Sequence, residues 1–286
     1  MIRKAVATDV QAIERYLAGY PETSMFLRNN LHLYGIDRSS APHASQYWID
    51  LKEGEICSVV GKSNNGYMMV QAPAATHAPN GFWSEVATLM QGLVVRGMTG
   101  VPAQVDAAFA ALGLRDAAFL VNKDEPLYHI WLKDVKSGPV EMRLATLEDV
   151  DLLAQWFEGY TLDTGLTRSR TEAAQDAKVR ANQAVNNPDV MVLIEDDLPV
   201  AMAGINARVA DMVQIGGVYT PPATRGQGMA RRAVAGLLAR QKGIEQSILF
   251  AADEPAARAY EGIGYRQIGT YRVAMLTQAQ TIGATL

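Results

Sequence analysis

The sequence predicts an α+β protein built from two tandem copies of one fold, each a mixed, mostly antiparallel sheet flanked by helices. Three observations predict this fold class. The chain has 286 residues, enough for two domains of about 140 residues each. A polar segment with a Gly-Pro break, residues 133–139, lies near its middle and is typical of a linker. Residues 3–20 also resemble residues 143–160 at a constant offset, without gaps.

The internal repeat predicts the order of elements in each half. Average residue frequencies would make roughly one position of the two segments agree, but these positions agree: Arg3/Arg143, Ala5/Ala145, Asp9/Asp149, Val10/Val150, Gly19/Gly159 and Tyr20/Tyr160. A second similarity between the halves relates residues 112–115 (LGLR) to residues 263–266 (IGYR). Each half is therefore expected to open with a strand and a helix that begins near an Asp, and to close with a helix, a Gly turn and a strand. We place the two domains at residues 1–135 and 141–286.

The second half shows its elements in the hydrophobic pattern. A β-branched apolar run followed by three acidic residues predicts a strand and a turn. Apolar residues at spacings of three and four predict a helix, and Pro255 suits the first turn of a short one. Hairpins followed by a strand–helix–strand unit imply a mixed sheet covered by helices. The expected elements are helix and loop at 161–189, strands at 190–194, 198–207 and 212–219, a helix at 229–241, a strand at 247–251 and a short helix at 255–261.

The loop between the third strand and the long helix is a candidate anion site. Gly226 and Gly228 permit positive φ and leave room for backbone N–H groups to approach a ligand. The following helix offers free N–H groups and the positive end of its dipole. Arg231 and Arg232 occupy its first turn, where cations are unfavourable. Either both arginines face solvent, or an anionic ligand bound at this loop compensates for their position.

Two other phosphate-binding loops fit less well. Residues 61–63 (GKS) supply the end of a Walker loop, but Ile56 occupies the position of its first glycine. A dinucleotide-binding fingerprint would need a small residue where Arg231 stands. Neither is predicted here.

Two motifs in the second half carry a resemblance to a known family. Residues 225–230 (RGQGMA) resemble the Arg/Gln-x-x-Gly-x-Gly/Ala loop of the GNAT acetyltransferases, in the same setting of strand, loop and long helix. Residues 253–265 (DEPAARAYEGIGY) resemble the family's closing motif, with Asp253 where Asn is usual. The resemblance covers residues 141–280. Tandem GNAT proteins, often with one degenerate copy, also occur, so the fold expected here is two tandem GNAT-like domains.

The resemblance implies an acyl transfer from acetyl-coenzyme A to an amine by direct attack. It implies a pyrophosphate site at Arg225, Gly226, Gln227, Gly228, Met229, Ala230 and Arg231, with Asp253 as a further coenzyme A residue. It implies that Val218, Tyr219 and Thr220 hydrogen-bond the pantetheine arm and that an N–H there polarises the thioester carbonyl. Tyr260 matches the position that donates to the departing thiolate. A covalent route through cysteine is disfavoured because residues 141–286 contain no Cys, and they also contain no His.

The general base is left open by the sequence. Glu158, Glu195 and Asp211 are available carboxylates, but each also suits a solvated surface or turn position. A water relay is the other alternative.

The first half lacks an equivalent glycine-containing loop for an anion. Residues 72–81 contain one glycine, no arginine and two prolines, which have no N–H. We therefore expect a degenerate copy that serves as scaffold or acceptor-pocket wall, and one coenzyme A per chain between residues 218 and 260. His77 is interpreted as a loop histidine, and Cys57 as a core residue rather than a nucleophile.

Composition excludes several other classes. The net charge of −4 argues against nucleic acid and acidic lipid as partners, and a single cysteine excludes an intramolecular disulfide and a cysteine metal cluster. No apolar run is long enough to span a membrane. We expect a cytoplasmic enzyme without a metal, acting on a small-molecule or peptide amine. The alternatives are a non-catalytic acyl-CoA sensor and a transferase that uses another activated donor.

Overall fold

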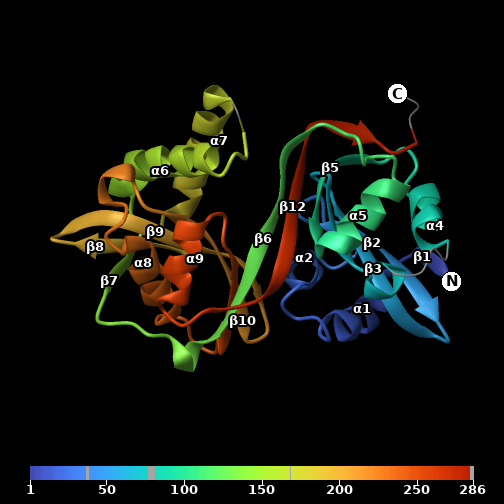
Figure 1. The fold of residues 1–286 in the computed structure, drawn as a ribbon, viewed down its shortest axis with the longest axis horizontal. Coiled ribbons are helices and arrows are strands. Elements are labelled where there is room, and N and C mark those ends of the chain that lie inside the picture. The colour runs from blue at the N-terminus through green and yellow to red at the C-terminus, as the bar shows by residue number, and fades with distance from the viewer. Residues whose placement is uncertain (37–38, 77–80, 168, 284–286) are drawn as a thin grey trace. The chain divides into compact units, whose positions relative to one another are not determined.

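The computed structural model describes residues 1–36, 39–76, 81–167 and 169–283, and these form two compact units (Figure 1). The first unit combines Met1–Asp124 with Thr270–Leu286, and the second is Glu125–Gly269. These limits differ from the expected boundaries after residues 135 and 140. Strands β6 (Phe119–Trp131) and β12 (Arg266–Thr281) each continue through a unit limit without a turn. The expected linker at residues 133–139 consequently lies inside the second unit.

The first unit contains a sheet in the order β1-β2-β3-β4-β5-β12. Its described pairs are antiparallel except β4 with β5. The strands are β1 (Ile2–Lys4), β2 (Ser45–Lys52), β3 (Glu55–Ser63), β4 (Tyr67–Gln71), β5 (Val94–Gly100) and the part of β12 from Thr270 onward. The helices are η1 (Ala7–Asp9), α1 (Val10–Leu17), α2 (Met25–Tyr34), α3 (Pro73–Thr76), α4 (Phe82–Leu89) and α5 (Pro102–Ala111).

The second unit contains a sheet in the order β6-β11-β10-β9-β8-β7. Its described pairs are antiparallel except β10 with β11. The strands after β6 are β7 (Glu141–Leu144), β8 (Val190–Glu195), β9 (Leu198–Val209), β10 (Met212–Tyr219) and β11 (Gln246–Phe250). The helices are η2 (Leu132–Asp134), η3 (Leu147–Asp149), α6 (Val150–Asp163), α7 (Arg170–Ala184), η4 (Pro222–Thr224), α8 (Met229–Leu238) and α9 (Glu254–Glu261).

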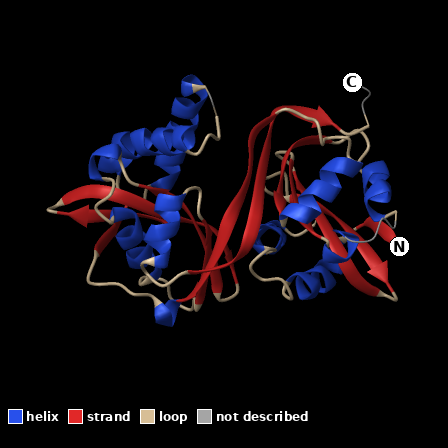
Figure 2. Ribbon diagram, in the orientation of Figure 1, coloured by secondary structure: helices blue, strands red, loops and turns tan. Residues whose placement is uncertain are grey.

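Helices cover both faces of the sheet in the second unit (Figure 2). Successive side chains of a strand point to opposite faces. Along β8, Val192 and Ile194 accordingly pack with α6 and α7, whereas Leu193 packs with α8 and α9. Alanines at 173, 177, 181 and 184 form the buried stripe of α7. Among the described residues, no helix is long and apolar enough to cross a membrane.

The expected elements of the second half are present with small shifts in their ends. The strands predicted at 190–194, 198–207 and 212–219 are β8, β9 and β10, and the predicted long helix begins at Met229 and ends at Leu238. The region 161–189, expected to hold helix and loop, contains the end of α6 and all of α7. Ser169 caps α7 by accepting a hydrogen bond from the Glu172 N–H.

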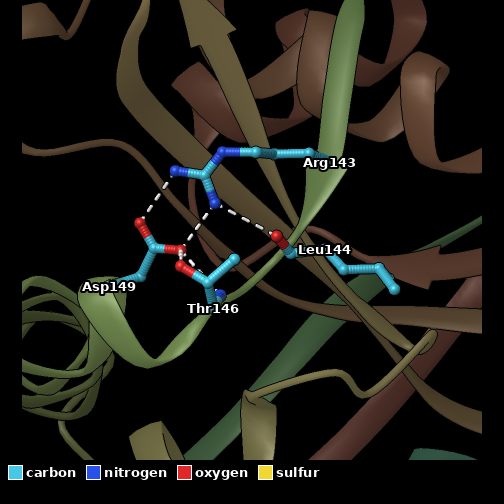
Figure 3. A network of polar contacts seen from close by, with 4 residues as sticks. All are labelled: Arg143, Leu144, Thr146 and Asp149. Atoms are coloured by element: carbon cyan, nitrogen blue, oxygen red, sulfur yellow. Dashed lines mark hydrogen bonds and ion pairs between the residues drawn. The ribbon is translucent and has the colours of Figure 1, made fainter.

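Both copies of the internal repeat form a polar network, and Figure 3 shows the network of the second half. Arg143 donates to both carboxylate oxygens of Asp149 at 2.5 and 2.9 Å, and Asp149 also accepts from the Thr146 N–H at 2.7 Å. In the first unit Arg3 donates to both oxygens of Asp9 at 2.6 and 2.7 Å. Each pair ties the opening strand to the start of the following helix. The Arg and Asp that both halves share in sequence therefore form the same ion pair in both units.

The second similarity, between residues 112–115 and 263–266, also reflects a shared local structure. Gly113 and Gly264 both have positive φ, 72° and 108°. Each follows a helix with proline in its first turn, α5 with Pro102 and α9 with Pro255. A Cβ on Gly264 would lie 2.9 Å from the Asp134 carbonyl oxygen, so that turn requires glycine.

Candidate active site

Strand β10 separates from its parallel neighbour halfway along its length. The paired residues of β10 and β11 run from Met212–Gln246 to Ile215–Leu249. On the other side, the register with β9 breaks between Gly216 and Tyr219, which leaves a bulge at residues 217–218. The second half of β10 therefore has an edge that β11 does not pair.

Two glycines make this bulge possible. Gly217 has a φ of 59°, in the left-handed region. A Cβ on Gly216 would lie 1.8 Å from Asn206 Nδ2, so a side chain there would collide with β9. The Gly-Gly pair thus explains locally why β10 bends away from β11.

The loop after β10 ends in a cradle of backbone N–H groups. Gly226 and Gly228 have φ of 77° and 82°, and Gly228 is the N-cap residue of α8 without any side-chain cap. The first helical hydrogen bond runs from the Arg232 N–H to the Gly228 carbonyl. The N–H groups of Met229, Ala230 and Arg231 therefore have no intrahelical acceptor and are available for an anion.

The two arginines of the first helical turn have different environments. Arg232 pairs with Glu195 at 2.8 Å, so its charge is already compensated. Arg231 lies over the cradle, since a Cβ on Gly228 would be 2.9 Å from its Nε. Of the candidate bases, Glu195 is engaged in this ion pair, and Asp211 accepts a hydrogen bond from Gln246 Nε2. Arg231 is therefore the arginine of this turn that can face an anion at the loop.

The other residues expected at the loop are placed by side-chain contacts. Arg225 donates to Asp163 Oδ2 at 2.6 Å and to the Thr220 carbonyl at 3.0 Å, with its guanidinium 5.6 Å from the Tyr219 ring centre. Gln227 is exposed and donates to the Ala223 carbonyl at 3.4 Å. The Met229 side chain is buried, so only its backbone is open to a ligand.

The end of β10 contributes one buried polar atom without a partner. Within the described part of the chain, Thr220 Oγ1 makes no hydrogen bond, and such an atom is costly unless a ligand or water satisfies it. Tyr219 turns its side chain toward α6, where a Cβ on Gly159 would be 2.2 Å from the Tyr219 hydroxyl. Val218 is partly buried and packs with the helices of the opposite face.

Asp253 has a structural role. Its Oδ1 accepts a hydrogen bond from the Ala256 N–H at 2.8 Å, and it is the N-cap residue of α9. A carboxylate at this position stabilises the helix by capping it and by interacting with its dipole. Its charge also contributes to raising the pKa of Tyr260.

Tyr260 lies on α9 with only 6% of its surface exposed. Burial raises the pKa of its phenol strongly, and Tyr160, Asp253 and Glu125 raise that pKa further. Tyr260 therefore keeps its proton at neutral pH, as a hydrogen-bond donor must.

A second group of polar residues surrounds Tyr160 on α6. Burial raises the pKa of Tyr160, Arg180 lowers it, Glu125 raises it, and a hydrogen bond from the Gly217 N–H lowers it. Arg180 and Tyr160 therefore lie together beside the bulge of β10, where the charge of Glu125 also acts. Sequence reasoning missed Glu125, Tyr160 and Arg180. The one available signal was the alanine stripe of α7, which places Arg180 beside the buried Ala177 and Ala181.

The corresponding strand end in the first unit is closed. The pairs of β4 with β5 continue to Val70–Gly100, next to the end of β4. The Ala72 N–H donates to Gln104 Oε1 at 2.6 Å, and Pro73–Thr76 form the short helix α3. Residues 77–80, His77 among them, lie outside the described residues.

Cys57 differs slightly from its predicted core position. It is only partly buried in β3. Burial raises the pKa of its thiol, and the charge of Asp50 raises it further. Both effects disfavour a reactive thiolate.

Comparison with known proteins finds a family match within the second unit. Residues 152–265 match the Acetyltransferase (GNAT) family, whose members transfer acyl groups from acyl-CoA. No curated protein matches the chain in sequence. A GCN5-related N-acetyltransferase from Sphaerobacter thermophilus is 15% identical, with a TM-score of 0.59 and 100% of this chain and 97% of that chain covered. A tandem GNAT protein from the clavulanic acid biosynthesis pathway is 11% identical, with a TM-score of 0.54 and 100% and 99% covered. The expected α+β fold with tandem GNAT-like domains agrees with these structures, and the match to the GNAT family covers residues 152–265.

Proposed function

We propose that the second unit is an N-acyltransferase that passes the acetyl group of acetyl-coenzyme A to an amine. The observation that carries this proposal is the open half of β10, which leads directly into the glycine cradle at the start of α8. An extended, amide-bearing arm that ends in a pyrophosphate suits such an edge and such a cradle.

The residues fit coenzyme A in three respects. The N–H groups at residues 226–231 and the Arg231 guanidinium would hold the pyrophosphate. The unpaired edge at Val218 and Tyr219 would hydrogen-bond the amides of the pantetheine arm as an added strand does. The Thr220 hydroxyl lacks a protein partner among the described residues and would gain one from the ligand. A side chain at residue 228 would occupy the cradle.

The chemical step needs no covalent enzyme intermediate. The amine nitrogen attacks the thioester carbon, the new C–N bond forms, and the C–S bond breaks. A backbone N–H at residues 218–220 would stabilise the developing oxyanion. The amine must first lose its ammonium proton, and the departing thiolate must gain a hydrogen bond or a proton.

Tyr260 and Glu125 suit these two proton roles. Because the pKa of Tyr260 is raised, full transfer of its proton to a thiolate is unfavourable, and we assign it a hydrogen bond to the leaving sulfur. The ammonium proton leaves to a carboxylate or through a water, and Glu125 is the carboxylate whose charge raises the pKa of both phenols.

Titration calorimetry with coenzyme A, followed by thiol release from acetyl-coenzyme A with a panel of amines, tests this function. We expect binding with a stoichiometry near one and amine-dependent thiol release. Binding without thiol release would identify a sensor. Amine transfer without coenzyme A binding would identify another activated donor.

A further inference from the structure

Arg180 is a half-buried cation in the wall of the proposed site. Its guanidinium carbon lies 4.4 Å from the Phe157 ring centre and 5.4 Å from that of Tyr160. Its Nη1 is 3.5 Å from Thr161 Oγ1, a long hydrogen bond. Because two aromatic rings and a hydroxyl contact it, the guanidinium plane is held in one orientation.

No carboxylate within the described residues forms an ion pair with Arg180. Several other arginines of the second unit do form such pairs, namely Arg143–Asp149, Arg208–Asp189, Arg225–Asp163, Arg232–Glu195 and Arg258–Glu254. Asp176, one turn earlier on α7, is exposed and acts on Arg180 only at longer range. Burial lowers the pKa of Arg180, because removing the charged guanidinium from water is unfavourable. A buried cation of this kind is stabilised once a ligand brings an anion.

The position of Arg180 indicates which ligand brings that anion. A Cβ on Gly217 would lie 4.0 Å from Arg180 Nη2, so the guanidinium reaches the bulge of β10. The pyrophosphate already has its own site at residues 226–231. An anion next to Gly217 would therefore belong to the acceptor rather than to coenzyme A.

We propose that the acceptor is a small molecule carrying both an amine and a carboxylate, as an amino acid does, and that Arg180 binds the carboxylate. This inference rests on the proposed N-acyltransferase function. A guanidinium presents two parallel N–H donors that match a carboxylate. The amine of the same molecule is thereby held near the thioester carbon.

Matched acceptors and a variant without the guanidinium test the inference. Each of a panel of amino acids is compared with its carboxamide and its decarboxylated amine in the thiol-release assay. We expect kcat/KM for the carboxylate form to be at least about tenfold higher than for its two analogues, because each analogue loses one charge-assisted contact with Arg180. Arg180→Met, which keeps an unbranched apolar side chain but removes the guanidinium, should raise KM for the amino acid by a similar factor and leave KM for the carboxamide unchanged.

Two further variants separate binding from structure. Arg180→Lys should recover part of the loss, because a lysine keeps the charge but not the planar fork. Arg240→Met, at an exposed arginine after α8, should leave the ratio of acid to amide unchanged. Coenzyme A affinity should be equal in all variants, which shows that the unit is folded.

The outcomes are distinguishable. If amines turn over equally well with and without a carboxylate, and Arg180→Met leaves the ratio unchanged, the acceptor inference is overturned while the proposed function stands. If coenzyme A binds and no amine releases thiol, the proposed function fails and the acceptor inference fails with it.

Discussion

The replacement of Gly228 by valine tests the cradle most directly. Gly228 has a φ of 82°, a conformation that costs a residue other than glycine on the order of 1–3 kcal/mol. A Cβ there would also lie 2.9 Å from Arg231 Nε, so the arginine must move from the loop. A loop that relaxes to avoid this strain redirects the N–H groups that point toward the anion.

The effect on affinity follows from the hydrogen bonds lost. A hydrogen bond to a charged group contributes about 1.5–3 kcal/mol, and each 1.4 kcal/mol is about tenfold in Kd. Losing one N–H contact to the pyrophosphate should therefore raise the Kd for coenzyme A by about tenfold to a hundredfold. Titration calorimetry measures this directly.

Gly243→Val is the matched control. Gly243 has a φ of 70°, and a Cβ at this residue would have no atom within 4 Å, so the same backbone strain arises away from the cradle. Both variants should lose a similar amount of stability to urea, but only Gly228→Val should lose affinity. An unchanged Kd in a folded Gly228→Val protein would refute the assignment of this loop. Gly228→Ala serves if the valine variant does not fold.

Three further results are expected. Tyr260→Phe should lower kcat and leave coenzyme A affinity unchanged, because the phenol acts on the leaving sulfur; single-turnover kinetics measure this, and full turnover would return Tyr260 to a packing role. Calorimetry should give one coenzyme A per chain, since the strand end in the first unit is closed; a second specific molecule there would contradict this. Asp149→Asn should destabilise the second unit by about 2 kcal/mol at pH 7, because Arg143 and Thr146 lower the pKa of Asp149 from 3.8 to about 2.

The pH dependence of the last variant has a defined sign. A carboxyl whose pKa is lowered by folding stabilises the protein above its unfolded pKa, and this contribution disappears as pH falls through the folded value. The stability gap between the wild type and Asp149→Asn should therefore be constant from pH 7 to about 5 and shrink as the pH falls toward 2. Urea unfolding across this range checks it. A gap that stays constant down to the lowest pH of the series would show that Asp149 acts only through packing.

The sequence by itself determined the features that depend on residues close together in the chain, such as turns, helix starts and short-range ion pairs. Gly226 and Gly228 indicated positive φ, and the change of hydrophobic period placed the start of α8 at Met229. The repeated Arg and Asp at the start of each half indicated one arrangement used twice. Each of these is set by residues within a few positions of one another, so a linear pattern is enough to predict them.

Tertiary structure alone decided the unit limits and the composition of the site. Strands β6 and β12 are long and carry no turn at residues 124–125 and 269–270, because their residues pair with neighbours distant in sequence. Glu125, Tyr160 and Arg180 come from a strand and two helices, and none has a distinctive local pattern. Their burial and mutual charges, which determine their chemistry, exist only once the sheet has brought them to the bulge of β10.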